Sequence, residues 1–192
     1  MRGQGRAKRI GAVAGAGALT PAWVLAGCDS VMEAIGESLP TGRAEPCPEG
    51  GVQLAEGEGS AAMGLRVADF QLVNCGSATY VLEGYPEIRP LLNGGHRPLH
   101  VDIGHGTNGV TSPATGGDAP PRRVTLQPGQ AATTGLLWRN LFTDSTVPAA
   151  EGRVLELVPK PGAPRLTLRL SAPVDLGDTG KLGLSAWSAL AR

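Results

Sequence analysis

Aromatic residues and net charge are what this sequence most lacks. Aromatic side chains make up 4% of the 192 residues, and 17 basic and 17 acidic residues cancel to a formal net charge of zero. Few rings are therefore left for stacking on sugars or bases once a core is built, and no basic field attracts nucleic acid. The 29 glycines and 16 prolines stay just below the level typical of low-complexity disorder. The composition favours a folded domain with no nucleic-acid partner.

Charge is also missing from residues 10–28, which follow a basic N-terminus. A basic segment followed by an apolar one and by small residues is typical of a secretory signal. The segment ends in Leu25-Ala26-Gly27-Cys28, which resembles the lipobox of bacterial lipoproteins. We expect residues 1–27 to be a signal peptide, and Cys28 to carry lipid, including palmitate, and to anchor the protein on the extracytoplasmic face of the cell membrane. The alternative is an uncleaved membrane helix, although glycine and alanine dilute its hydrophobicity.

Cleavage before Cys28 changes the charge of the protein. It removes four basic residues and no acidic one, which leaves a formal net charge of −4. An acidic surface is not attracted to anionic lipid headgroups. The sequence therefore predicts that the lipid, and not a basic patch, holds the protein on the membrane.

Three cysteines are an odd number for an exported protein. If Cys28 is acylated, Cys47 and Cys75 remain as one pair, and the far side of the membrane allows disulfides. We expect a Cys47–Cys75 disulfide; the alternative is two free buried thiols.

The remainder of the chain divides into a flexible tether over residues 28–46, one domain over residues 47–187 and a short tail over residues 188–192. Apolar residues in the domain alternate with a period of two, and glycine- and proline-rich turns separate the runs, which indicates an all-β antiparallel sandwich or barrel. A parity slip near Ala68-Asp69 predicts a β-bulge there, and Gln127-Pro128-Gly129-Gln130 has the residues of a type II turn. The expected strands cover residues 65–72, 80–82, 88–92, 99–103, 124–126, 132–138, 154–158, 166–170 and 182–184.

Several short motifs occur in order along this domain. They are Asn74-Cys75-Gly76, Gly84-Tyr85-Pro86, Leu126-x-Pro128-Gly129-x-x-Ala132, Trp138-Arg139-Asn140 and Asp175-Leu176-Gly177. Together they resemble a family of small exported actinobacterial proteins known as domain of unknown function 4232. The resemblance covers about residues 47–187 and implies an immunoglobulin-like β-sandwich in a lipoprotein or secreted protein. It implies no catalytic residue and no cofactor.

Physical chemistry gives these motif residues structural roles. We expect Gly84 to adopt a backbone angle closed to other residues, and Pro86 to end strand pairing. Tyr85 is expected to bond its hydroxyl to a nearby carbonyl, as a tyrosine corner does. Trp138 is expected in the core rather than as a platform for a sugar.

The sequence has one metal-like cluster, made of His96, His100 and His105 with Asp102. His100 and Asp102 are two residues apart and would share a strand face, and His105 could approach from the following loop. Zinc or copper accepts such ligands, so an exported metal-binding protein is an alternative function. The other interpretation is a half-exposed strand face with unrelated polar side chains, because the spacing fits no standard ligand pattern.

Two enzyme-like patterns are weaker still. Residues 104–109 match the dinucleotide fingerprint letter by letter, but a loop follows where the fingerprint needs a helix, so we expect no nucleotide. Ser60 lacks the closing glycine of a nucleophile elbow. An exported hydrolase is therefore the least favoured alternative, and we expect the protein not to be an enzyme.

The segment over residues 104–121 is long for a loop in a compact domain, and such loops are either functional or disordered. We expect it to be a contact surface for an envelope protein or a wall component; a solvated mobile flap is the alternative. The sequence thus predicts a non-enzymatic cell-envelope lipoprotein that acts by binding.

Overall fold

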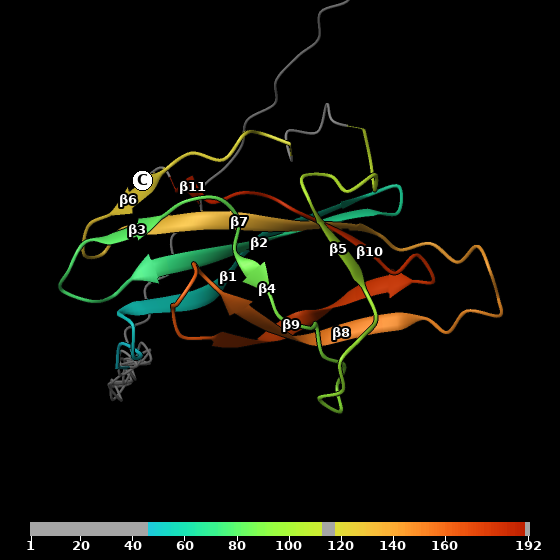
Figure 1. Ribbon diagram of the computed structural model, residues 1–192. Helices are drawn as coiled ribbons and strands as arrows, with labels where there is room; N and C mark the ends of the chain where they lie inside the picture. Colours follow the sequence, from blue (N-terminus) through green and yellow to red (C-terminus); the bar gives the residue numbers. More distant parts are fainter. Residues whose placement is uncertain (1–45, 113–117, 191–192) are drawn as a thin grey trace, which may run out of the picture. The chain divides into compact units, whose positions relative to one another are not determined.

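The computed structural model describes residues 46–112 and 118–190, and these form an all-β structure (Figure 1). The fold class that the sequence predicts is confirmed. The signal peptide, the lipidation site Cys28, nearly all of the tether and part of the loop over residues 104–121 lie outside the described residues. Within the described residues there is no helix with the length and apolarity needed to cross a membrane.

The largest sheet has the strand order β1-β2-β7-β10-β5. Neighbouring strands are antiparallel except β10 and β5, which pair in parallel. The short strand β11 pairs with β7 beyond the end of β10. The strands are β1 (Val52–Ala62), β2 (Leu65–Asn74), β7 (Ala131–Arg139), β10 (Lys181–Leu184), β5 (Asp102–His105) and β11 (Ser188–Ala189).

Two smaller sheets complete the structure. β4 (Glu87–Ile88), β8 (Ala150–Val158) and β9 (Leu166–Gly177) pair in the order β4-β8-β9, and β3 (Tyr80–Leu82) pairs with β6 (Val124–Leu126). In Figure 1 the β8–β9 sheet lies across one face of the large sheet, so the sheets form the two layers of a sandwich. The core between the layers is one cluster that includes Phe70, Leu136, Leu155 and Leu176.

The period-two pattern explains this core. On β2, Phe70, Leu72 and Asn74 are buried, while the residues between them are partly exposed. On β7 the same inner face carries Leu136 and Trp138. Alternate residues of a strand point to opposite sides of its sheet, so the expected alternation places one face of each strand in the core.

The strand over residues 52–62 is absent from the expected set and forms β1. Its outer half, Glu56–Ala62, is rich in glycine, alanine and serine, which have low β-propensity and give no alternating apolar signal. β1 is paired along β2, and the register shifts between Glu56 and Gly59 opposite Asp69. A bulge is therefore present at the predicted position, but it belongs to the neighbouring strand. β1 holds the extra residue, and β2 pairs with β7 without interruption.

Three other expectations differ from the structure. The strand expected over residues 88–92 is reduced to β4 and an isolated bridge at Leu92, and the one expected over residues 99–103 begins only at Asp102. The parallel pairing of β10 with β5 departs from the expected antiparallel arrangement. Ser188 and Ala189, expected in the tail, pair with β7 as β11.

Candidate functional site

The Asn74-Cys75-Gly76 motif closes one end of the domain. Asn74 is 1% exposed. Its side-chain NH₂ donates to the carbonyls of Ala78 and Leu126, and its Oδ1 accepts a hydrogen bond from the Gly76 N–H. The predicted Cys47–Cys75 disulfide is present beside it. This motif therefore fixes the start of the domain to β6.

The turn over residues 127–130 docks on the same asparagine. Gly129 has a φ of 80° and its N–H donates to the Asn74 carbonyl, while the Gln130 N–H closes the turn on Gln127. The positive φ at the third position is that of the expected type II turn. Two motifs that lie about fifty residues apart in the chain thus form one hydrogen-bonded unit.

The Trp138-Arg139-Asn140 and Asp175-Leu176-Gly177 motifs form a second unit. The Asp175 carboxylate accepts hydrogen bonds from Trp138 Nε1, at 3.1 Å, and from the Asn140 amide. Trp138 is 5% exposed and lies in the core. Gly177 bridges to Leu141, just beyond the first motif. These side chains are engaged in joining β7 to β9.

The Gly84-Tyr85-Pro86 motif is also structural. Gly84 has the expected positive φ, 81°, and its carbonyl accepts a hydrogen bond from the Trp187 N–H. The Tyr85 ring stacks on the His105 ring, with centroids 3.8 Å apart and planes 2° from parallel. This ring stack holds Tyr85 against the end of β5, and the hydroxyl bond expected of a tyrosine corner stays a prediction.

The three candidate metal ligands are not brought together. His105 stacks on Tyr85, and Asp102 lies 3.9 Å from the Lys181 ammonium. No group of three His, Cys, Asp or Glu side chains within residues 46–112 and 118–190 is arranged to hold a metal ion. The strand expected to carry both His100 and Asp102 begins at Asp102, so the shared face on which the hypothesis depended does not form.

The beginning of the loop over residues 104–121 packs onto the large sheet. Thr107 is 5% exposed, and its N–H and hydroxyl donate to the Asp118 carboxylate. The Asn108 amide bonds to the carbonyls of Asp102 and Leu182, and Arg139 Nε donates to the Val110 carbonyl. Residues 106–110 therefore pack on the sheet, and the contact surface expected over residues 104–121 stays a prediction.

A groove of about 480 Å³ opens between the edge strand β1 and β9. A volume of this size is typical of small-ligand sites. Small residues of β1 and β9 line it together with the apolar residues Val67, Phe70, Leu170 and Val174. The β1 bulge shapes this groove, because Gly57 and Gly59 lie close to the backbone of Asp69 and Val67.

The charge of this groove is negative. The residues that line it include four acidic ones, Glu56, Glu58, Asp69 and Asp175, and one basic one, Arg66. Burial raises the pKa of the Asp69 carboxyl, and the negative charge of Glu58 raises it further. The arrangement favours positively charged groups over anions.

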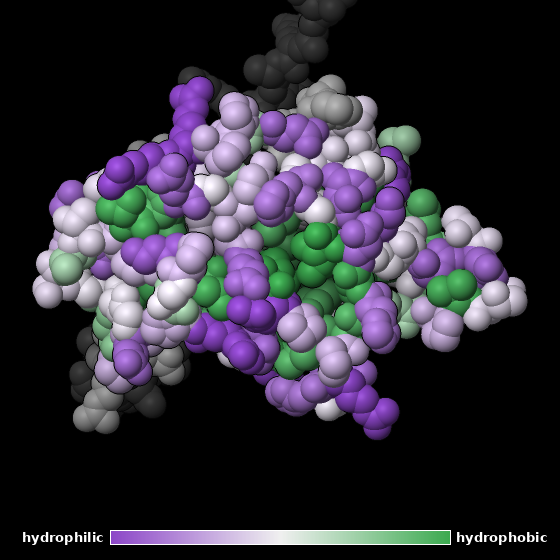
Figure 2. Space-filling view, viewed as in Figure 1, coloured by the Kyte–Doolittle hydropathy of each residue, from purple (hydrophilic) through white to green (hydrophobic). Residues whose placement is uncertain are grey.

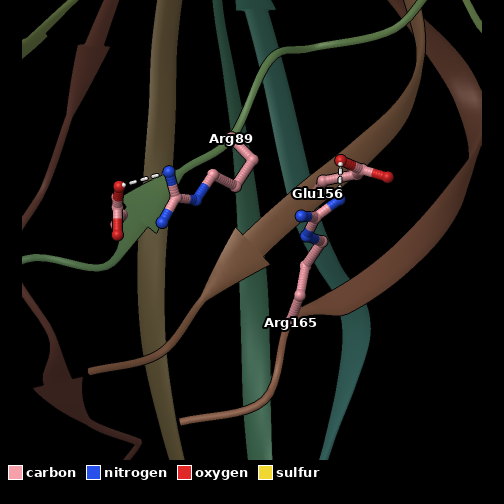
Figure 3. Close-up of polar contacts among 4 residues, drawn as sticks. Arg89, Glu156 and Arg165 are labelled. Carbon is pink, nitrogen blue, oxygen red and sulfur yellow. Dashed lines mark hydrogen bonds and ion pairs between the residues drawn. The ribbon is translucent and has the colours of Figure 1, made fainter. Parts of the chain in front are cut away.

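Three carboxylates on the β4-β8-β9 sheet are paired with arginines. Glu156 pairs with Arg165 at 3.0 Å, and Arg89 pairs with Glu87 at 3.0 Å (Figure 3). Glu151 pairs with Arg153 at the start of β8. The Arg89–Glu87 and Arg153–Glu151 pairs are exposed and contribute little to stability. All three pairs neutralise charge locally.

The domain matches one known protein family. A family model described as "Domain of unknown function (DUF4232)" matches residues 47–188. The chain belongs to this family. No curated protein and no solved structure gives a match.

Ser60 is the candidate nucleophile in the sequence of this DUF4232 domain. It lies exposed on β1, opposite Val67, and lines the groove between β1 and β9. None of the side chains that line this groove is a histidine. The geometry therefore gives Ser60 no adjacent imidazole that could act as its base.

Tyr80 carries an unusual polar group in the DUF4232 domain. Its hydroxyl is the one buried side-chain polar atom of the described residues that has no hydrogen-bond partner. Burial raises the pKa of this phenol. The Lys160 ammonium lies 3.9 Å from the ring centroid and donates to the Val81 carbonyl, so the ring itself has a favourable contact.

We predict that Tyr80→Phe leaves the free energy of unfolding unchanged or raises it by up to about 1 kcal/mol, because it removes an unpaired buried hydroxyl and keeps the ring. Urea denaturation measures the change. Tyr80→Leu is the matched control, since it removes the ring beneath Lys160 and should be destabilising. A Tyr80→Phe protein that loses stability as Tyr80→Leu does would show that the hydroxyl has a partner.

Proposed function

We propose that this protein is a cell-envelope lipoprotein, held by a lipid on Cys28 at the extracytoplasmic face of the membrane, which acts by binding and not by catalysis. The observation that carries the proposal is the Cys47–Cys75 disulfide. It accounts for two of the three cysteines, so Cys28, which follows Leu25-Ala26-Gly27, is the thiol that remains for acylation.

The disulfide also supports the compartment. Structural disulfides form and persist in oxidising environments and are rare in the cytosol. The bridge closes a loop with a sequence separation of 28, which in the chain-entropy model stabilises the fold by roughly 3–4 kcal/mol. A domain built this way is suited to the outside of the cell.

The family motifs support a binding role. The polar atoms of these motifs, in Asn74, Trp138, Asn140 and Asp175, bond to one another or to backbone groups. They build a rigid frame and leave recognition to the surfaces around it. A partner that is an envelope protein or a wall component fits such a frame, since rigid surfaces lose little entropy on binding.

Metabolic labelling with radioactive palmitate tests the anchor. We expect the full-length protein to be labelled and to sediment with membranes, and Cys28→Ala to lose both properties, because two acyl chains are needed for stable anchoring. The double variant Cys47→Ala/Cys75→Ala is the matched control: it removes the two disulfide-bonded cysteines and should keep the label. Equal labelling of the Cys28→Ala protein would refute the proposal.

A further inference from the structure

Exposed apolar side chains gather at one end of the domain. Of the five large hydrophobic residues that are exposed in the described part of the chain, only Leu190 lies elsewhere. The other four form what we call the apolar tip: Met63 in the β1–β2 turn, and Leu141, Phe142 and Val147 in the β7–β8 loop. The turn and the loop touch, because the Asn140 N–H donates to the Gly64 carbonyl at 2.9 Å. Figure 1 shows both at the same end of the sandwich.

Met63 has a positive φ, a backbone conformation that favours asparagine, aspartate or glycine over methionine. Ala62 pairs with Leu65, and the two residues between them have φ values of 48° and 80°, which makes a two-residue turn of type I′. Such turns favour asparagine, aspartate or glycine at the first position. The left-handed conformation is unfavourable for methionine, yet the side chain is 96% exposed and gains no burial within the domain.

The β7–β8 loop holds its apolar residues in a fixed frame. The Asp178 carboxylate accepts hydrogen bonds from the backbone N–H groups of Thr143 and Asp144. Asp144 in turn accepts from the N–H and the hydroxyl of Thr146, at 2.8 and 2.6 Å. Phe142 precedes this network and is 73% exposed. An aromatic residue displayed on a preordered loop loses little conformational entropy when it is buried by a partner.

The charges around the apolar tip distinguish among possible occupants. Residues 140–150 contain no Lys or Arg, and Arg139, which precedes them, donates to the Val110 carbonyl. The carboxylates of Asp144 and Asp178 carry negative charge within this loop network, and its hydrogen bonds lower the pKa of both. Anionic lipid headgroups would be repelled, and a symmetric contact with a second copy would bring like charges together. Figure 2 shows the loop as a lobe in which hydrophobic surface is surrounded by hydrophilic surface.

The chain that precedes the domain enters at the opposite end. It joins beside Cys47, whose partner Cys75 follows the Asn74–Val52 pair at the start of β1. Met63 lies beyond the far end of this 11-residue strand, roughly 35 Å away at about 3.3 Å per residue. The apolar tip is therefore separated from the Cys47 end of the domain by the length of the sheet.

We propose that the apolar tip docks into an apolar pocket of another envelope protein, and that Lys or Arg residues form the rim of that pocket. This inference rests on the proposed binding function and names the surface and the chemistry of its partner. Phe142 and Met63 enter the pocket, and the rim cations face Asp144 and Asp178. Burial of aromatic and methionine side chains in this way is typical of the centre of protein interfaces.

Site-specific photo-crosslinking in living cells tests the proposal on the full-length protein. A benzophenone analogue of phenylalanine replaces Phe142, and the same analogue at Ser77, exposed at the opposite end, is the positional control. We expect position 142 to form a discrete protein adduct whose crosslinked peptide is apolar and flanked by Lys or Arg, and position 77 not to form it. An adduct whose crosslinked peptide is not apolar, or is not flanked by Lys or Arg, counts against the proposal.

Two variants separate docking from folding. Met63→Asn should reduce the adduct at least about ten-fold while raising the melting temperature by a few degrees, because asparagine suits the turn. Ser145→Lys, which places a cation beside Asp144, should reduce the adduct several-fold. A yield unchanged by either variant, a lipid adduct, a crosslinked dimer or no adduct at position 142 would overturn the proposal.

The outcomes also distinguish this inference from the proposed function. Position 142 could capture nothing while the analogue at Ser77, or at Ser60 in the groove, captures a protein. The docking proposal for the apolar tip would then be wrong, and the proposed binding function would stand. If no position captures a protein, both fail. Palmitate labelling is independent of either result.

Discussion

Replacing Asn74 by alanine is expected to lower the free energy of unfolding by about 3 kcal/mol. The amide of Asn74 is buried and joins three backbone groups, those of Gly76, Ala78 and Leu126. Alanine removes all three hydrogen bonds and leaves a cavity where the amide was. Urea denaturation of the oxidised protein measures the loss.

Two further variants isolate the cause. Asn93 makes a similar set of bonds, accepting from the N–H groups of Gly95 and Arg97, but in an exposed loop, so Asn93→Ala should cost less than about 1 kcal/mol. Asn74→Asp keeps the shape but cannot donate to either carbonyl and buries a charge, so it should be at least as damaging as Asn74→Ala. Equal losses for Asn74→Ala and Asn93→Ala would show that burial does not set the cost.

Local chemistry was enough to predict several parts of the fold. The residues at 127–130 require a turn whose third position has a positive φ, and Gly129 has it. The same reasoning identified the positive φ of Gly84. Alternating apolar residues identified β7 and the burial of Trp138, because a strand with one buried face must alternate. These properties depend on a few adjacent residues and can be read from a single sequence.

Properties that depend on distant partners could not be predicted. β1 has a weak strand signal in its outer half and forms because β2 offers it an antiparallel edge. Asp175 meets Trp138 only after β9 has packed against β7. The groove depends on the same packing, since β1 and β9 form its two sides. The metal site expected from His100, Asp102 and His105 does not form, for the opposite reason. These residues are close in sequence, but a distant residue, Tyr85, holds the His105 ring in a stack.

The apolar tip shows a related limit. Met63-Gly64 gives a weak hairpin signal, because methionine is not a residue that a type I′ turn favours. Leu141 and Phe142 could equally have been core residues, and only the structure shows them exposed beside that turn. A residue that violates a local preference without gaining burial is a signal that sequence analysis can search for.

Gly177→Ala is expected to be the most damaging single substitution in the Asp175-Leu176-Gly177 motif, with a loss of more than about 3 kcal/mol. Gly177 has a φ of 58°, which costs alanine about 1 kcal/mol or more. A Cβ at this position would also lie 2.0 Å from the Leu141 carbonyl oxygen. Because that atom belongs to the backbone, β9 and the start of the β7–β8 loop would have to move apart.

Gly162 in the β8–β9 turn separates the two effects. It has a φ of 78° and has no atom within 4 Å of the place where a Cβ would lie, so Gly162→Ala should cost only the backbone conformation, about 1 kcal/mol. Both variants gain equally from the stiffer unfolded chain, and the difference between their denaturation midpoints reports the contact with Leu141. If the two losses were equal, the close approach of β9 to the β7–β8 loop would be excluded. The rigid display of Phe142 depends on that approach, and it would then lose its structural basis.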